Sequence, residues 1–384
     1  MLPSRPLVWA LLALFLTLAQ GYNTPKLMRR LVNDYQSNTR QGLPRRGACT
    51  RDNLAVRREW SNLSKNERRD YIDALKCLAK KPSKINPVLA PGARSRFDDF
   101  QASHIINTPI IHATANFFAW HRHFLWLYEK ALREECGYKG YQPYWEWSHW
   151  ATLPTTANPL YDGSSTSLSG NGEYIPNRNG TIQHWPLPPD APPIGVYTPP
   201  GTGGGHIYNG PIANWEQHLG PVLYTYDNGV YVPPNPRPDG LGYNPRPIIR
   251  DFNSTLLKMA ANWDVVQFML VNLTDVRTFQ SVFFAGPHAA GHTFISGIDN
   301  DLFTSPGDPL FWFHHAQVDR IWSIWQALNF PEREYALDGT LTLLNFPPSR
   351  NATLADPMRF DFSPDIPIGD AMSPTKNRYC YIYE

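Results

Sequence analysis

Two groups of three histidines constrain this chain more than any other feature of its sequence. The six residues are His104, His112 and His121, followed by His288, His292 and His315. Imidazole nitrogen is a good ligand for copper, and three such ligands on one ion leave coordination positions open for a small molecule. Two triplets on facing helices would form a two-metal oxidation site, so the fold must bring distant helices together.

The second group has the spacing of a helical metal site. His288 and His292 are four residues apart, so on a helix they face the same way and can bind one ion. Phe283, Phe284 and Phe294 indicate that this segment is buried. Buried neutral histidines need partners, and a metal ion supplies one.

The choice between His314 and His315 follows from their helical faces. His314 shares its face with Leu310 and Val318, which is typical of core, and this favours His315 as the ligand. Asp319 lies one turn beyond His315. We expect its carboxylate to accept the proton of a ligand histidine and to orient the ring.

The first group draws on an aromatic helix predicted over residues 116–136. His121 lies on an aromatic face of that helix, whereas His123 points elsewhere, so the two cannot serve one site. We expect His104 to come from the preceding helix and His112 from the short loop after it.

Hydrophobic periodicity predicts a mainly α-helical domain over residues 49–384. Helices are expected over residues 53–80 (in two pieces divided near Leu63-Ser64), 96–106, 116–136, 251–270, 282–296 and 309–328. Ser64 and Glu67 have the form of a capping box. Gly and Pro clusters such as PLPPDAPP and PPGTGGG predict a loop-rich insertion over about 151–250, with a few short strands. Residues 22–48 are expected to form a loosely structured N-terminal arm.

The first 21 residues read as a secretory signal peptide. Arg5 precedes an apolar run over residues 7–19, which is too short to span a membrane comfortably, and small residues end at Gly21. We therefore predict a secreted, extracellular protein with no membrane association after cleavage. A net charge of +2 and the lack of a basic stripe give no indication of a nucleic-acid partner.

Sequons and cysteines agree with export. The candidate glycosylation sites are Asn62, Asn179, Asn253, Asn272 and Asn351. The four cysteines Cys49, Cys77, Cys136 and Cys380 form an even set without metal-site spacing, so we interpret them as structural disulfides. Three pairings are possible, and the sequence does not select one.

Several strings resemble a known family. HATANFFAWHRHFLWLYEKAL, YQPYWEW and DPLFWFHHAQVDRIW are similar to the type-3 copper proteins, which are the tyrosinases, catechol oxidases and hemocyanins. Finer strings such as PGARSRFDDF and ECGYKGYQPYW resemble the short secreted fungal tyrosinase/catechol oxidase group, from about Cys49 onward. The resemblance implies a four-helix bundle around a dinuclear copper centre, with dioxygen as the co-substrate. It also implies that the six histidines bind the two copper ions.

The resemblance implies a secreted polyphenol oxidase that converts o-diphenols to o-quinones. Many tyrosinases carry an Asn directly after the first histidine of the second site and a Glu nine residues before that histidine. Here these positions are Ala289 and Phe279, with Gln280 beside it, and none can act as a base. This departure favours catechols over monophenols. Leu302 and Phe303 are candidate pocket residues or core residues.

The sequence also allows other functions. The alternatives are a tyrosinase-type monooxygenase that modifies a phenolic secondary metabolite or peptide, an o-aminophenol oxidase and, with less support, a dioxygen carrier. The partners of all but the last are a small phenolic or aminophenolic substrate and dioxygen. The chain ends just after a tyrosine cluster over residues 379–383, so no C-terminal lid domain is expected. No feature of the sequence specifies an oligomeric state.

Overall fold

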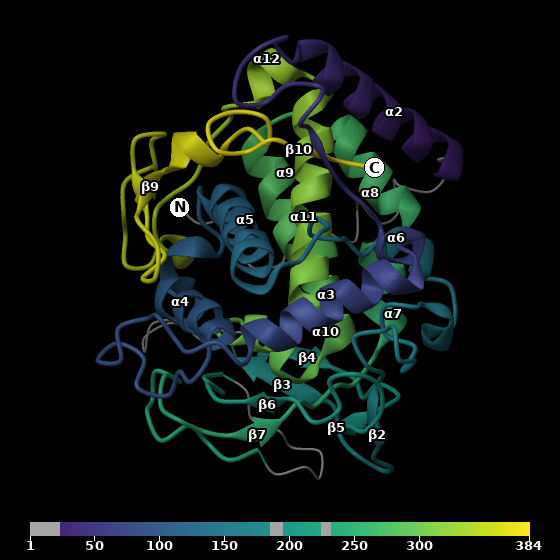
Figure 1. Ribbon diagram of the computed structural model, residues 1–384, viewed down its shortest axis with the longest axis vertical. Coiled ribbons are helices and arrows are strands. Elements are labelled where there is room, and N and C mark those ends of the chain that lie inside the picture. Colours follow the sequence, from purple (N-terminus) through teal and green to yellow (C-terminus); the bar gives the residue numbers. More distant parts are fainter. Residues whose placement is uncertain (1–23, 185–194, 224–231) are drawn as a thin grey trace.

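Four helices surround the two histidine groups in the computed structural model, which describes residues 24–184, 195–223 and 232–384. They are α4 (Arg96–Ile111), α5 (Phe117–Cys136), α10 (Ala289–Ile295) and α11 (Leu310–Ala327). α5 and α11 lie side by side at the centre of the molecule (Figure 1). The predicted helical bundle is confirmed, and α5 and α11 begin and end within one residue of their predicted bounds.

The remaining helices cover this bundle. α3 packs against α5, and α7 packs against α10. Their bounds are α2 (Thr24–Gly42), α3 (Lys65–Leu78), α6 (Trp147–Trp150), α7 (Ser254–Ala260), α8 (Trp263–Asn272), α9 (Val276–Phe283) and α12 (Phe330–Arg333).

Local polar contacts explain where two of these helices begin. The Ser64 hydroxyl accepts a hydrogen bond from the amide of Glu67, and the carboxylate of Glu67 accepts one from the amide of Ser64, as the predicted capping box requires. Ser95 and Asp98 form the same box at the start of α4, the helix that carries His104. Each box satisfies backbone donors that a helix leaves unpaired at its first turn.

Three of the predicted helices differ from those in the structure. The segment before Ser64 is the short strand β1 (Ala55–Arg57) followed by a 3-10 turn over Trp60–Asn62, because it pairs with the end of the chain. α4 continues through Pro109 to Ile111, five residues beyond its predicted end. The predicted helix over 251–270 is two helices, α7 and α8.

The predicted N-terminal arm is instead mostly the helix α2. Its apolar residues Met28, Leu31 and Tyr35 are buried, and their spacing of three and four residues places them on one face. This face packs against α11 and α8. The helix is stabilised by tertiary packing, which local composition did not reveal.

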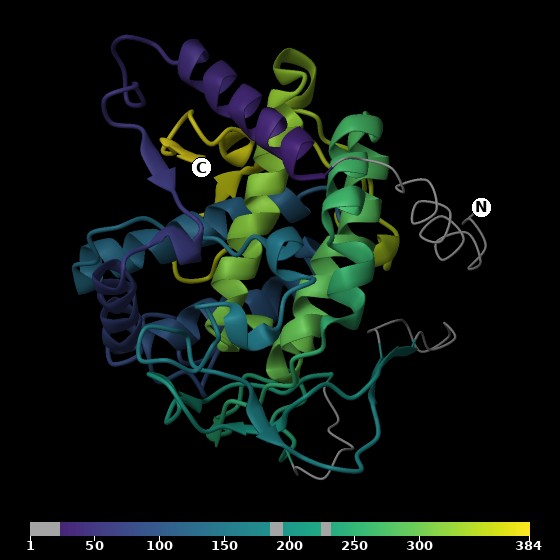
Figure 2. The same cartoon turned by 90° about the vertical axis from the view of Figure 1, so that its right-hand side faces the viewer.

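Short paired strands make up the rest of the ordered backbone. β1 pairs in parallel with β10 (Tyr381–Tyr383), and the other pairs are antiparallel. These are β2 (Gly172–Tyr174) with β5 (Gly204–Ile207), β3 (Thr181–His184) with β4 (Gly195–Thr198), β6 (Glu216–Gln217) with β7 (Arg246–Pro247), and β8 (Pro357–Met358) with β9 (Ile366–Pro367). Strands β2 to β7 gather on one side of the helices, within the predicted loop-rich insertion (Figure 2).

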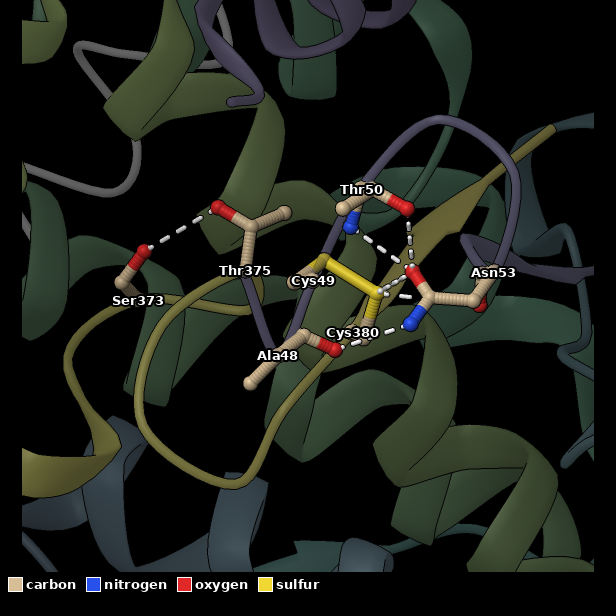
Figure 3. Close-up of a disulfide and its surroundings, with 7 residues drawn as sticks. All are labelled: Ala48, Cys49, Thr50, Asn53, Ser373, Thr375 and Cys380. Carbon is tan, nitrogen blue, oxygen red and sulfur yellow. Dashed lines mark hydrogen bonds between the residues drawn. A yellow bond between two sulfur atoms is a disulfide. The ribbon is translucent and has the colours of Figure 1, made fainter. Parts of the chain in front are cut away.

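Two disulfides join segments that are distant in sequence. Cys77–Cys136 links the last turns of α3 and α5, and Cys49–Cys380 links the segments that lead into β1 and β10. Beside the second bond, the Asn53 side chain accepts from the amide of Thr50 and donates to the carbonyl of Ala48 (Figure 3). The structure therefore selects one of the three pairings that the sequence left open.

A buried ionic cluster holds the end of the chain against α11. The carboxylate of Asp319 accepts hydrogen bonds from Arg122 at 2.6 Å and from the hydroxyls of Tyr381 and Tyr383 at 2.6 and 2.7 Å. Arg57 lies 3.4 Å from the same carboxylate, and its guanidinium stacks on the Tyr381 ring at 3.7 Å. The cluster thus joins α5, α11, β1 and β10 through one buried charge.

The structure tests some of the sequence features that indicate export. The expected signal peptide lies outside the described residues, and no helix among those described combines the length and apolarity needed to cross a bilayer. Asn62, Asn179, Asn272 and Asn351 are exposed, whereas Asn253 is buried. The prediction for Asn253 is therefore corrected, since its side-chain nitrogen donates to the carbonyl of Pro199 and its oxygen caps α7.

The insertion docks onto the start of α4 through His218. One ring nitrogen of His218 lies 2.7 Å from the Asp98 carboxylate, and the other lies 3.2 Å from Glu216. Partial burial opposes protonation, but the hydrogen bond and charge of Asp98, together with Glu216, raise the pKa of His218 above its usual value. The protonated imidazole therefore ties the insertion to the helix that carries His104.

Removing Arg122 should destabilise the fold strongly. Arg122→Leu leaves the buried Asp319 charge without its shortest ion pair, so we expect the free energy of unfolding to fall by about 3–5 kcal/mol. Arg277→Leu is the control, because this exposed arginine pairs with Asp338 at the surface and its loss should cost about 1 kcal/mol or less. Urea denaturation measures both, and equal losses would contradict the role of the cluster.

The contribution of His218 should depend on pH. Because its pKa is raised on folding, its stabilising effect is complete below the unfolded value of about 6.5 and is lost as the pH rises through the higher folded value. The melting temperatures of wild type and His218→Gln should therefore differ at pH 6 and converge by pH 9. His149→Gln, at an exposed position, is the control. A gap that widens with rising pH would be inconsistent with this account.

Candidate metal centre

The first histidine group lies between α4 and α5. His104 is on α4, His112 caps its C-terminal end, and His121 is on α5. All three are at most 1% exposed, and their ring centroids are 4.9 to 5.7 Å apart. Their ligand nitrogens lie within 4.8 Å of one another, a separation at which three imidazoles can bind one ion.

The histidines of the second group lie on a wide helical turn, on α10 and on α11. Residues Phe284–His288 form a π-type turn that contains Pro287, which lacks the N–H of a regular α-helical turn. This turn leads directly into α10, so His288 and His292 lie on the same side. Nε2 of His292 lies 3.1 Å from Nε2 of His288 and 3.2 Å from Nε2 of His315.

The two groups meet through a ring stack. The imidazoles of His121 and His315 are 4.5 Å apart between centroids and only 21° from parallel. His121 comes from α5 and His315 from α11, the two central helices. The ligand nitrogens of the two groups are thus neighbours within one buried region.

Most of the rings are oriented by hydrogen bonds from Nδ1. Three imidazoles are paired through Nδ1 with the carbonyl four residues earlier in the chain: His112 with Thr108, His121 with Phe117, and His288 with Phe284. Because a carbonyl can only accept, Nδ1 carries the proton in each ring. The lone pair of each ring is therefore on Nε2, the nitrogen that points into the group.

The segment from Asp299 to Phe303 orients one histidine of each group. The carbonyl of Phe303 accepts from Nδ1 of His104 at 2.8 Å, and the carboxylate of Asp299 accepts from Nδ1 of His292 at 3.1 Å. Sequence reasoning missed both contacts. The spacing of seven residues between His292 and Asp299 gives no helical signal, because the chain turns sharply between them at Ser296 and Gly297.

Burial keeps the six imidazoles neutral. Desolvation lowers the pKa of His104 and of His292 to about 3, and it lowers the pKa values of the other four well below the usual range. Neutral imidazole is the form that binds metal ions. At physiological pH the site therefore presents ligands rather than cations.

The geometry fits a pair of bound cations. The Nδ1 protons of His288 and His292 are both donated away from the site, so their Nε2 lone pairs face each other at 3.1 Å. Nε2 of His104 and of His121 is buried without a hydrogen-bond partner among the described residues. Facing lone pairs are repulsive unless a cation lies near both, and an all-imidazole donor set suits copper.

His314 also enters the second group, which the sequence reasoning did not predict. Its ligand nitrogen lies within 4.8 Å of those of His288, His292 and His315. Its ring packs against Trp147 at 5.1 Å, and within the described residues no ring of the first group contacts it. His314 thus lies on the outer side of the second group. His123 is outside both groups, and its Nδ1 is hydrogen-bonded to the Tyr379 hydroxyl at 2.7 Å.

The expected role of Asp319 is wrong. Its carboxylate is taken up by Arg122, Arg57 and two tyrosines rather than by a histidine. Nδ1 of His315 has no hydrogen-bond partner in the described part of the chain. Helical facing placed Asp319 near His315, but the charges packed against the other side of α11 form stronger hydrogen bonds.

The candidate pocket residues fall into two sets. Phe279 is fully buried and stacks on Trp325 at 4.7 Å, so it is a core residue, whereas Phe303 is only partly buried and packs against a small core that includes Ile105. Ala289 and Leu302 are partly exposed. Gln280 is buried, and its amide donates to the carbonyl of Thr114 at 2.7 Å, beside the loop that follows His112.

Comparisons with known proteins agree with this arrangement. The family model described as the common central domain of tyrosinase matches residues 94–328. The tyrosinase-like protein orsC of Emericella nidulans is 71% identical over 90% of this chain and 94% of its own length. Tyrosinase P of Aspergillus terreus is 39% identical over 86% of this chain and 92% of its own. A solved polyphenol oxidase from Thermothelomyces thermophila superposes with a TM-score of 0.84, at 41% identity, over 94% of this chain and 99% of that one.

Proposed function

Because the chain belongs to the tyrosinase family and is a copper oxidoreductase, we propose that it oxidises o-diphenols to o-quinones with dioxygen as the co-substrate. One observation carries the proposal: six buried, neutral imidazoles lie in two groups that meet at the stack of His121 on His315, and in five of them an Nδ1 hydrogen bond leaves the Nε2 lone pair free for a metal ion. This arrangement supports two copper ions held close enough to act on one small molecule.

The ligand assignment is part of the proposal. We assign His104, His112 and His121 to one copper ion and His288, His292 and His315 to the other. The stack of His315 on His121 supports this choice over His314, since His315 contacts the first group and His314 lies on the outer side of the second group, against Trp147. When bound, the copper pair would bind dioxygen and pass to it the electrons of two o-diphenols, giving two o-quinones and two waters.

The protein residues hold this chemistry in place. The Nδ1 hydrogen bonds fix the ring directions, and all six imidazoles are at most 9% exposed, so burial limits the access of water to the site. His292 is the most exposed of the six, at 9%, and Ala289 and Leu302 are partly exposed. We propose that the substrate approaches the site beside His292, with Ala289 and Leu302 along its path.

A preference for o-diphenols follows from the candidate pocket residues. Ala289 has no polar side chain, Phe279 is core, and the amide of Gln280 is committed to Thr114. None of these residues is a base that would deprotonate a monophenol, whereas an o-diphenol is more easily oxidised.

Export is also part of the proposal, and two disulfides and four exposed sequon asparagines support it. Sequencing the N-terminus of the secreted protein tests it, and we expect that terminus at Tyr22.

Copper content should distinguish the two adjacent histidines. We expect the loaded wild type to keep two copper ions per chain, and His315→Ala and His292→Ala each to lose the ion of the second group. His314→Ala should keep both ions, because its ring lies on the outer side of the second group, away from the first group. Metal analysis after gel filtration measures this. Loss of copper in His314→Ala with full retention in His315→Ala would reverse the assignment.

A substrate panel on the copper-loaded protein tests the activity. Dopamine should turn over roughly a hundredfold or more faster than tyramine, the scale on which a positioned base contributes. His292→Ala is the control for activity outside the site. Similar rates for the two substrates would favour a monooxygenase, faster turnover of an o-aminophenol would change the substrate class, and reversible dioxygen binding without turnover would indicate a carrier.

A further inference from the structure

We propose that Asp299 is the positioning residue of His292, and that its charge makes retention of the second copper ion depend on a carboxylate. The inference rests on the proposed function, because it takes the second histidine group to bind copper. It concerns a residue that lies outside both groups and reaches copper only through the imidazole of His292.

The acceptor that Asp299 offers to Nδ1 of His292 differs in kind from the Nδ1 acceptors of four other rings. Its Oδ2 accepts from Nδ1 of His292 at 3.1 Å, whereas the partners of His104, His112, His121 and His288 are neutral backbone carbonyls. A carboxylate partner makes the opposite ring nitrogen a stronger donor than a carbonyl partner does. The second group therefore contains one ligand that is electronically distinct from the ligands of the first.

The backbone adopts an unusual conformation to deliver this carboxylate. After α10, Ser296 has φ +57° and ψ −153°, a conformation that residues with side chains rarely adopt. Gly297 follows with φ +57°, and a Cβ there would lie 1.9 Å from the carbonyl oxygen of Ile249. The short turn that begins at Gly297 then places Asp299 beside the ring of His292, seven residues after it.

Among the described residues, no arginine or lysine pairs with Asp299. It is 1% exposed, and its Oδ1 has no hydrogen-bond partner among the described residues. The neighbouring arginine, Arg250, is committed to Asp308 by two hydrogen bonds of 2.7 and 2.8 Å. The positive charge that would balance Asp299 is therefore the copper ion on the far side of the His292 ring.

This arrangement predicts that replacing Asp299 has opposite effects in the metal-free and the copper-loaded protein. Without copper, no counter-ion balances the Asp299 carboxylate, and burial raises its pKa well above the usual value, so holding this group ionised against His292 destabilises the protein. With copper bound, the same charge strengthens the ligand and favours retention of the ion. A purely structural residue would lose stability in both states when replaced.

The test replaces the charge and keeps the hydrogen bond. Asp299→Asn retains an oxygen that can accept from His292, so the ring should keep its direction. We expect the metal-free variant to melt at the wild-type temperature or above it. In the copper-loaded variant, we expect the second ion to be released to a chelator about ten- to a hundredfold more readily than from wild type. The first ion should be retained as in wild type.

Two further variants make the outcome decisive. Asp299→Ala, which removes the hydrogen bond as well, should lose the second ion at least as readily as Asp299→Asn. Glu129→Gln is the matched control, because this buried carboxylate pairs with Arg57 and contacts none of the six histidines. It should lower the melting temperature of the metal-free protein and leave copper release unchanged.

The failures of this inference and of the proposed function are distinguishable. A wild type that retains no copper would overturn the proposed function. A wild type that holds two ions, with Asp299→Asn releasing copper at the same rate, would overturn only the inference. A metal-free Asp299→Asn that melts well below wild type would reduce Asp299 to a structural residue and would also overturn it.

Discussion

The hydrogen bond from a histidine Nδ1 to a fixed acceptor is the interaction on which this site depends. In three of the six rings the acceptor is the carbonyl one turn earlier, so the phase of the helix alone sets the direction of the imidazole. In two others it is supplied by the segment from Asp299 to Phe303. With the protons held outward, the Nε2 lone pairs face inward, and burial keeps them neutral.

The rest of the fold keeps these helices in register. The Asp319 cluster joins the back of α11 to α5 and to the C-terminal strand, and the two disulfides link the segments that flank the same elements. Each contact joins parts of the chain that lie far apart in sequence. Within the described residues, no hydrogen bond joins the charged side chains of this cluster to a histidine of either group.

The local part of this arrangement was predictable from the sequence. Period-3.6 spacing located α5 and α11, and a four-residue spacing paired His288 with His292. Long-range contacts were not predictable. Asp319 lies on the expected face of α11, but its carboxylate forms an ion pair with Arg122. Asp299 contacts His292 only because the chain turns between them at two residues with positive φ. α2 was missed because its stability comes from packing against α8 and α11, and the entry of His314 into the second group depends on its packing beside Trp147.

The central claim is that each histidine group binds one copper ion through Nε2. A crystal structure of the copper-loaded protein, with anomalous data collected at the copper absorption edge, tests this most directly. The account predicts two anomalous peaks, one bonded to Nε2 of His104, His112 and His121 and the other to Nε2 of His288, His292 and His315. A single peak, or a second ion bonded to His314 in place of His315, would contradict it.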